Sequence, residues 1–382
     1  MQENNKKGPF DLPLLPPTID YIALVSHIAS AHSALARLDE TLLHLSNPEI
    51  IERTFLTREA VLSSQIEGTQ ATLEEVFKEE AISGENISEV TKKMQDIREV
   101  LNYRRATREG VKLVDGNEPL SENNVKRLHS ILLHSVRGKT KTPGEFRREQ
   151  VYIAPPGTPM AEARYIPPTP PRIPELYSNF DRYFNTDTAE RDPLVQLAVS
   201  HYQFEAIHPF NDGNGRVGRL LIPLFLYRRK ILSKPYMYVS KYFEEHRRDY
   251  YDLLADVSYK DAWTPWLRFF LNGLTEQAND ACALVHEIVE MQKSFHAVLS
   301  DFNSPYALNL LDTLFAHPVC TTAQMRTIAG IKNNQTVLNL IRKFEKSDIL
   351  IDVSPDRKRN KTYAFMPLLD IINHYGERKR KH

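Results

Sequence analysis

The stretch His208-Pro-Phe-Asn-Asp-Gly-Asn-Gly-Arg-Val-Gly-Arg219 brings groups that act on phosphate esters to one bend between two helical patterns. The His208 imidazole can serve as a general base near neutral pH, because its unperturbed pKa is about 6.5. Asp212 offers the hard oxygen ligand that Mg²⁺ prefers. Residues 213–215 can turn successive N–H groups into one concavity, and a helix that starts there adds the positive end of its dipole.

Two arginines complete this set. Arg216 and Arg219 lie three residues apart, so both can project from the first turn of the following helix. Guanidinium groups suit phosphate oxygens. Taken singly, each feature is common: a histidine before proline is usually structural, and Asn-Asp-Gly-Asn-Gly is most often only a turn. Their concentration in twelve residues favours a site for phosphate-ester chemistry.

The composition is that of an ordinary globular protein. The 382 residues suffice for two or three domains, with 41% hydrophobic and 26% charged residues and no net charge. The two cysteines, Cys282 and Cys320, cannot form a disulfide framework. No signal-peptide pattern and no apolar run of about 20 residues is found, so we expect a cytoplasmic protein without a membrane partner.

The pattern along the chain predicts a mainly helical fold in several parts. We expect an N-terminal arm and helices over residues 1–115, a catalytic core over 116–275, a connecting helix over 276–300 and a further domain over 301–382. Proline-rich sequence around residues 151–166 contains two short β-prone runs, which predict an irregular hairpin.

The last domain has its own pattern. Three helical segments precede two strands with a charged tip, which is typical of a winged helix-turn-helix domain. Asn333, Asn334 and Gln335 fall at the start of the predicted recognition helix, where such side chains can contact base edges. Lys358 and Arg359 fall at the wing, where they could contact phosphates. Winged helices also serve as protein-interaction or dimerisation modules, and that alternative stays open.

The bend resembles the signature of the Fic family, His-x-Phe-x-(Asp/Glu)-Gly-Asn-Gly-Arg-x-x-Arg, and every defining position matches between His208 and Arg219. The resemblance extends through the proline-rich arm, the hairpin and the stretch SKYFEEHRRDYYDLL, and it covers residues 1 to about 275. It implies a Fic-type helical core with a small β-hairpin flap. The activity it implies is transfer of AMP from ATP to a Ser, Thr or Tyr hydroxyl of a target protein, with Mg²⁺ or Mn²⁺ as cofactor.

The resemblance also implies residue roles. His208 would deprotonate the target hydroxyl, Asp212 would hold the metal, and Arg219 would hold the γ-phosphate. The nucleotide would lie against Glu67, Ile153, Ala154, Asn211, Asp212, Gly213, Asn214, Gly215, Arg216, Arg219, Tyr250 and Tyr251. Val151, Tyr152 and Ile153 of the flap would receive an extended segment of the target, as a strand added to a sheet edge.

A second motif, Ser63-x-x-x-Glu67-Gly68, is similar to the inhibitory helix of the family, here expected over about residues 57–70. By this resemblance Glu67 would pair with Arg219, and ATP would then bind in an unproductive pose. The chain would thus be an autoinhibited protein adenylyltransferase.

Other functions stay open at this point. On the same site, the chain could remove AMP from a modified target or transfer another phosphate-containing group. From a different class, it could be a DNA-binding transcription regulator with a nucleotide-sensing core. The expected partners are ATP, a target protein, and DNA or a protein at the winged helix; a homodimer also stays open.

Overall fold

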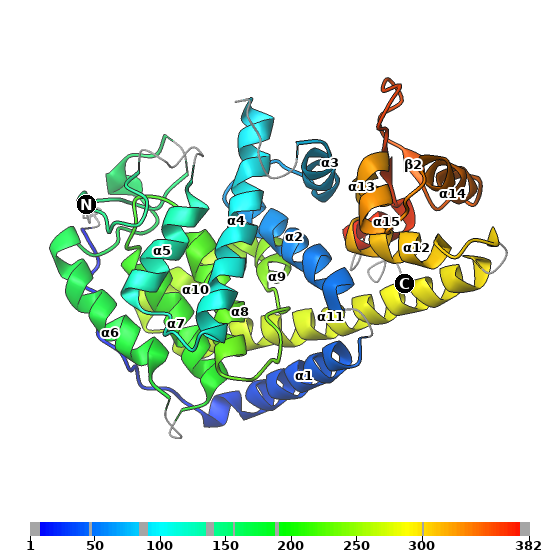
Figure 1. Ribbon diagram of the computed structural model, residues 1–382. Coiled ribbons are helices and arrows are strands. Elements are labelled where there is room, and N and C mark those ends of the chain that lie inside the picture. Colours follow the sequence, from blue (N-terminus) through cyan, green and yellow to red (C-terminus); the bar gives the residue numbers. More distant parts are fainter. Residues whose placement is uncertain are drawn as a thin grey trace. The chain divides into compact units, whose positions relative to one another are not determined.

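The computed structural model describes residues 8–45, 48–83, 91–134, 141–155, 157–187, 191–299 and 302–374 (Figure 1). It is mainly helical, as predicted. The chain divides into two compact units, the first formed by Met1–Asp39, Leu62–Gly68 and Asn102–Ala278, and the second by Glu40–Val61, Thr69–Leu101 and Asn279–His382. Each unit therefore combines segments that lie far apart in the sequence. The boundaries expected after residues 115, 275 and 300 stay predictions, and residues 300 and 301 lie outside the described ones.

The helices of the first unit carry the candidate site. Those wholly within it are α5 (Glu122–Leu132), α6 (Ile173–Asn185), α7 (Pro193–Ile207), α8 (Asn214–Arg228), α9 (Ser240–Glu245) and α10 (Arg247–Lys260), with 3-10 turns at Ile22–Leu24, Met160–Glu162 and Pro170–Arg172. Four helices contain a boundary between the units: α1 (Val25–Leu43), α2 (Pro48–Ile66), α4 (Lys92–Asp115) and α11 (Trp263–Leu299). Residues 276–299, expected as a connecting helix, are the second part of α11.

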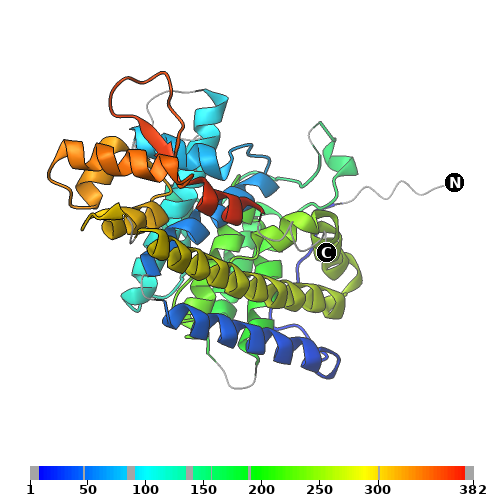
Figure 2. The ribbon, with the colours of Figure 1, turned by 90° about the vertical axis from the view of Figure 1, so that its right-hand side faces the viewer.

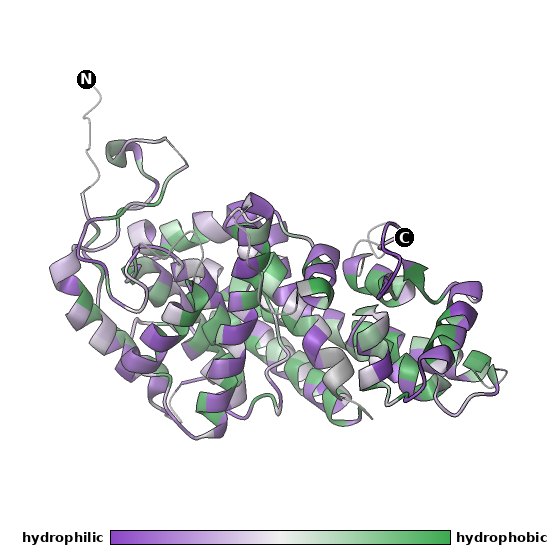
Figure 3. Cartoon of the chain, turned by 45° about the horizontal axis from the view of Figure 1, so that its top comes forward, coloured by the Kyte–Doolittle hydropathy of each residue, from purple (hydrophilic) through white to green (hydrophobic). Residues whose placement is uncertain are grey.

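Helix α7 is the centre of the first unit. Asp192 caps it by accepting hydrogen bonds from the N–H groups of Leu194 and Val195, and Pro193 occupies its first turn. Apolar residues of α7 occur on every side of the helix, which predicts that it is buried all round. Helices α6 and α8 pack on α7, and Trp266 of α11 donates its indole N–H to the carbonyl of Ala198 at 3.0 Å. Polar residues lie on other faces of the surrounding helices, which Figure 3 shows as purple stripes beside green ones.

The first part of α1 lies along the first part of α11 (Figure 2). His27 Nδ1 lies 2.8 Å from Asn272 Oδ1, and the Arg268 guanidinium donates to the carbonyl of Ala23 at 3.1 Å. These two exposed polar contacts join the first part of α11 to the start of α1 and to the turn before it.

The predicted flap, residues 151–166, contains one isolated β-bridge between Ile153 and Tyr165 rather than two regular strands. Pro155 ends the first arm and Pro167 follows the second, and because proline cannot donate to a ladder, pairing stops after one bridge. On the outer side of the second arm, the N–H of Phe10 donates to the carbonyl of Ile166 at 2.8 Å. The N-terminal arm therefore pairs with the flap.

The second unit holds a small antiparallel sheet. Its elements are α3 (Leu73–Ser83), α12 (Ala307–Ala316), β1 (Val319–Thr321), α13 (Thr322–Ile328), α14 (Asn334–Lys346), β2 (Ile351–Asp352), β3 (Thr362–Ala364) and α15 (Met366–His374). The strand order is β1-β3-β2, with Cys320 opposite Tyr363 and Asp352 also opposite Tyr363. Helix α3 contacts β1 and β3.

The three predicted helices and two predicted strands of the C-terminal part are present, whereas β1 and α15 were not expected. Identification of this arrangement as a winged helix stays a prediction. None of the described helices combines the length and the apolarity needed to cross a bilayer.

We predict that Thr321→Ala weakens α13 by about 1 kcal/mol, because Thr321 and Gln324 form a capping box at its start. Amide hydrogen exchange should show faster exchange at Gln324, whose N–H donates to the Thr321 hydroxyl. Thr321→Ser keeps the hydroxyl and should exchange like the wild type. Equal rates in the alanine variant would contradict the role of the cap.

Candidate functional site

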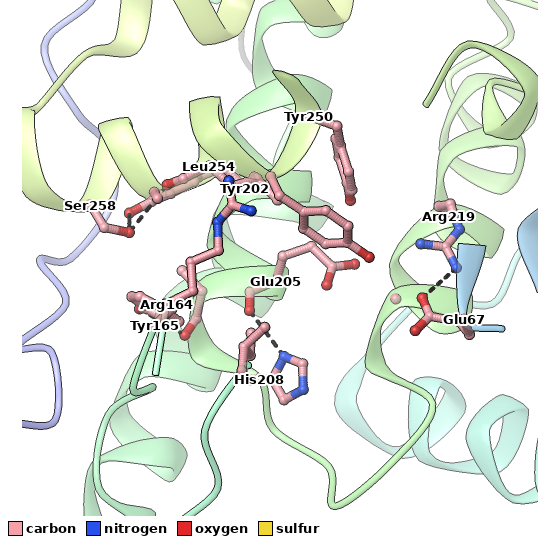
Figure 4. Close-up of a pocket in the computed structure, with 15 residues that line it drawn as sticks. Glu67, Arg164, Tyr165, Tyr202, Glu205, His208, Arg219, Tyr250, Leu254 and Ser258 are labelled. Atoms are coloured by element: carbon pink, nitrogen blue, oxygen red, sulfur yellow. Dashed lines mark hydrogen bonds and ion pairs between the residues drawn. The ribbon is translucent and has the colours of Figure 1, made fainter. Parts of the chain in front are cut away.

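The first unit contains a pocket of about 670 Å³ that opens to solvent (Figure 4). Seven predicted residues line it: Glu67, Ile153, His208, Gly215, Arg219, Tyr250 and Tyr251. Eight further residues line it that the sequence did not single out: Arg164, Tyr165, Tyr202, Glu205, Ala206, Leu254, Ala255 and Ser258. The fold thus joins the end of α2, the flap, the α7–α8 connection and α10 at one cavity.

The connection between α7 and α8 turns on a strained residue. His208 has left-handed backbone angles, φ 48° and ψ 60°. A non-glycine residue in this region costs about 1–3 kcal/mol and persists only where its surroundings impose it. Pro209 follows, and a residue before proline is disfavoured in a right-handed helix, so α7 ends here. Gly213, at φ 78°, ends the connection, and α8 begins at Asn214.

The loop between these two points is fixed by buried polar contacts. Asn214 accepts from the N–H of Phe210 at 2.9 Å and donates to the Phe210 carbonyl at 2.8 Å. The Phe210 ring is buried and stacks on His129, with ring centroids 3.8 Å apart. The Gly144 N–H donates to His129 Nδ1, so His129 Nε2 donates to the Asp212 carbonyl at 2.9 Å. The Asn214 side chain thus holds the loop, and contact of Asn214 with nucleotide stays a prediction.

The His208 side chain is a neutral imidazole. Its Nδ1 lies 3.3 Å from the Glu205 carbonyl, which can only accept, so Nδ1 carries the proton and Nε2 keeps its lone pair. Burial lowers the pKa of His208 to about 4, and the charge of Arg147 acts in the same direction. The imidazole is therefore unprotonated at neutral pH.

Arg219 and Glu67 form an ion pair at the pocket, marked by a dashed line in Figure 4. Arg219 Nη2 lies 2.7 Å from Glu67 Oε1, and the same guanidinium donates to the hydroxyl and the carbonyl of Ser63 at 2.9 and 2.8 Å. Burial would raise the pKa of Glu67, but the charge and hydrogen bond of Arg219 hold it below its ordinary value. Glu67 in turn holds the pKa of the buried Arg219 above its ordinary value against desolvation.

The Glu67 carboxylate sits against the first turn of α8. A Cβ at Gly215 would lie 2.3 Å from Glu67 Oε1, so only glycine leaves room for this oxygen. Helix N-termini attract anions through free N–H groups and the helix dipole. Glu67 therefore lies beside the first turn of α8, at the end of the helix that favours an anion.

Two family models match this chain. The model described as Fic/DOC family N-terminal matches residues 25–112, and the model described as Fic/DOC family matches residues 119–226. Together they span just over half of the chain, and the signature from His208 to Arg219 lies within the second. The chain belongs to the Fic/DOC family.

Curated relatives in this family carry the name protein adenylyltransferase Fic. The protein from Aedes aegypti is 30% identical over 201 residues, which are 52% of this chain and 35% of that protein. The protein from Culex quinquefasciatus is 31% identical over 201 residues, with the same coverage, 52% and 35%. The matched region therefore spans about a third of the length of these relatives.

Solved structures of Fic proteins share the fold. A Fic family protein from Desulfovibrio desulfuricans G20 has a TM-score of 0.56 at 23% identity, and the match covers 92% of this chain and 98% of that one. Fic-1 from C. elegans (residues 134–508) has a TM-score of 0.53 at 20% identity, covering 71% and 75%.

The helix that carries the second Fic motif is α2, which ends at Ile66, before the predicted limit of about residue 70. Gly68 has a φ of 93°, a left-handed value that stops the helix. The Arg247 guanidinium donates to the Ile66 carbonyl at 2.7 Å and so caps this end. Glu67 therefore projects from the end of the helix rather than from its middle.

The two predicted tyrosines differ. Tyr250 is buried, and its hydroxyl lies 2.9 Å from His201 Nε2, as expected of a core residue. Tyr251 lies at the pocket with the guanidinium groups of Arg164 and Arg247 5.7 and 5.9 Å from its ring centre. Tyr251 is the better placed of the two for stacking on a planar ligand.

Other predicted residues lie outside the lining of the pocket. Asp212, whose side chain is 41% exposed, accepts from Arg216 at 3.3 Å. Asn211 donates to the Thr142 hydroxyl at 3.2 Å. Ala154 and the flap residues Val151 and Tyr152 do not line the pocket either, and Tyr152 is exposed.

The predicted DNA-contacting residues belong to the second unit and are exposed: Asn333, Asn334, Gln335, Lys358 and Arg359. Asn333 caps α14 by accepting from the N–H of Gln335, and the Gln335 amide donates to Asn339 at 2.9 Å. Two of the candidate side chains are thus engaged within α14. DNA binding stays a prediction.

Two titratable residues near the site escaped the sequence analysis, namely the half-buried Glu205 and the buried Arg147. Burial raises the pKa of Glu205 to about 8, against the opposing charge of Arg219, and a Cβ at Gly218 would lie 2.3 Å from its Oε1. Glu205 precedes His208 by three residues on α7, so helical spacing could have placed it at the site. Arg147 has no such relation to the signature.

We predict that the free energy of unfolding of Glu205→Gln, measured relative to that of the wild type, is higher at pH 8 than at pH 5. The raised pKa means that the folded protein retains a proton that the unfolded chain loses above about 4.5. This contribution to stability is complete below 4.5 and is lost as the pH rises to 8, by roughly 1.4 kcal/mol per pH unit.

Urea unfolding followed by tryptophan fluorescence can measure this difference, because both tryptophans, Trp263 and Trp266, lie in the first unit. Glutamine stays neutral throughout, so the two stability curves should diverge between pH 5 and pH 8. Parallel curves would show that Glu205 titrates normally.

Proposed function

We propose that this chain is an autoinhibited protein adenylyltransferase, which transfers AMP from ATP to a Ser, Thr or Tyr hydroxyl of a target protein. The observation that carries the proposal is the neutral His208, with a free Nε2, in one pocket with the Glu67–Arg219 pair. The name shared by the curated relatives supports the same activity.

In the proposed reaction, His208 Nε2 accepts the proton of the target hydroxyl. The hydroxyl oxygen forms a bond to the α-phosphorus of ATP, and the bond from that phosphorus to the bridging oxygen breaks, so that diphosphate leaves. The low pKa of His208 keeps Nε2 unprotonated at neutral pH, as a base requires. The N–H groups at the start of α8 and the buried charge of Arg219 would stabilise the phosphates.

The residues present fit a metal ion that enters with the nucleotide. No cluster of three or more His, Cys, Asp or Glu side chains able to hold a metal alone occurs among the described residues. Asp212 offers one partly exposed carboxylate, and Mg²⁺ commonly takes one carboxylate together with phosphate oxygens and waters. When bound, Mg²⁺ would neutralise charge that develops on the phosphates.

The proposed inhibition follows from competition for Arg219. The guanidinium is about 1% exposed, and Glu67 and Ser63 take hydrogen bonds from it. A γ-phosphate would need the same group, and the Glu67 carboxylate already lies beside the first turn of α8. ATP could then enter the pocket, but its terminal phosphate would be displaced from Arg219.

We predict that Glu67→Gly raises AMP incorporation roughly 10- to 100-fold, because a hydrogen bond to a charged group contributes about 1.5–3 kcal/mol. The measurement is incorporation of label from α-labelled ATP with Mg²⁺ into the proteins of a cell lysate. Gln65→Gly is the matched control, since it introduces glycine two residues before Glu67, in the last turn of α2, without removing the carboxylate. Equal incorporation by Glu67→Gly and the wild type would contradict inhibition by Glu67.

In the Glu67→Gly background, His208→Ala should abolish transfer and leave ATP affinity within about threefold, because His208 acts on the hydroxyl rather than holding the nucleotide. Calorimetric titration with ATP separates the two effects. Transfer at an undiminished rate would exclude His208 as the base.

A further inference from the structure

The last turn of α7 ends in carbonyl groups that the helix itself cannot satisfy. His208 donates hydrogen bonds to two of these carbonyls: its backbone N–H donates to Phe204, and its Nδ1 donates to Glu205. The Tyr165 hydroxyl donates to the Ala206 carbonyl at 3.1 Å. The Ile207 carbonyl accepts from Arg147 Nη2 at 3.4 Å. Residues outside α7 thus complete its end.

Arg147 also donates to the two main-chain carbonyls that follow Ile207. Its Nε donates to the His208 carbonyl at 2.8 Å, and its backbone N–H donates to the Pro209 carbonyl at 2.9 Å. Together with Ile207, three consecutive carbonyls around the catalytic position accept hydrogen bonds from this one residue. They surround the left-handed turn at His208, which its surroundings must impose.

The same guanidinium also holds both ends of the flap. Its Nη1 donates to the Glu149 carbonyl at 3.1 Å, just before the flap, and its Nη2 donates to the Pro168 carbonyl, just after it. Both Tyr165 of the flap and His208 line the pocket (Figure 4). One planar group therefore joins the base of the flap to the main chain of His208.

Arg147 is buried, and no ion pair of Arg147 is found in the part of the chain that the structure describes. Its charge is offset by main-chain carbonyls at the negative end of the α7 dipole. Lysine would keep this charge, but it lacks the planar fork that reaches several carbonyls at once. The arrangement therefore depends on the geometry of the guanidinium as well as on its charge.

We propose that Arg147 is a positioning residue that couples the flap to His208, so that a peptide seated on the flap fixes the main chain of the catalytic base. The proposal rests on the proposed function for its catalytic consequence only. The link between the flap and the loop can be measured without any transfer activity.

The kinetic test uses Arg147→Lys in the Glu67→Gly background, with Arg148→Lys as the matched control. Arg148 is the exposed neighbour and pairs with Glu145. Arg147→Lys should lower the apparent kcat for labelling of lysate proteins roughly 100-fold, the effect of a small misplacement of a reacting group, and leave the KM for ATP within about twofold. Arg148→Lys should change neither. An unchanged kcat in Arg147→Lys, or a loss explained by KM or by Tm, overturns the proposal.

Hydrogen exchange separates this proposal from the proposed function. In Arg147→Lys, the amides of Ile153 and Arg164 in the flap and of Phe210 in the loop should all exchange at least about tenfold faster than in Arg148→Lys. A change confined to one of the two segments overturns the coupling. If no variant transfers AMP, the proposed function fails while this result still decides the role of Arg147.

If Arg147→Lys does not fold, hydrogen exchange of the wild type tests the coupling instead. In urea below the unfolding transition, the amides of Arg147, Ile153 and Phe210 should open with one common dependence on urea. Independent opening of the flap and the loop would show that Arg147 does not couple them.

Discussion

The buried guanidinium of Arg219 is the constraint around which the pocket is arranged. A charge at 1% exposure requires an anion or a set of acceptors, and the end of α2 supplies both through Glu67 and Ser63. The requirement extends to α8 itself, where Gly215 and Gly218 leave room for the carboxyl groups of Glu67 and Glu205. Two carboxyl groups thus lie close to one buried guanidinium.

This sharing explains why the two carboxyl groups differ. Glu67 has the direct hydrogen bond to Arg219, and its pKa falls, whereas Glu205 lacks that bond and burial raises its pKa to about 8. One cation can fully compensate one anion, so the second carboxyl group keeps its proton at neutral pH. Without Glu67, Glu205 would be the remaining carboxyl group beside Arg219, unless a phosphate took the position of Glu67.

The sequence was sufficient for the parts of the fold and site that depend on local pattern. The helices other than α15, strands β2 and β3, and the family membership follow from periodicity and from the signature between His208 and Arg219. Strand β1 was missed because three residues carry too little pattern, and the contact of α3 with the sheet was missed because no local signal joins residues so distant in sequence. Arg147 was missed for a related reason: its partners are main-chain carbonyls, which any sequence provides.

The pairing of the N-terminal arm has a consequence for the flap. Phe10 takes the outer side of the second arm at Ile166, so the chain itself completes that edge. The edge that carries Val151 and Tyr152 is then the side on which an extended peptide could still add. For the proposed docking of a target segment, a flap with one closed edge leaves a single side on which that segment can align, which restricts which of its alternating side chains face the pocket.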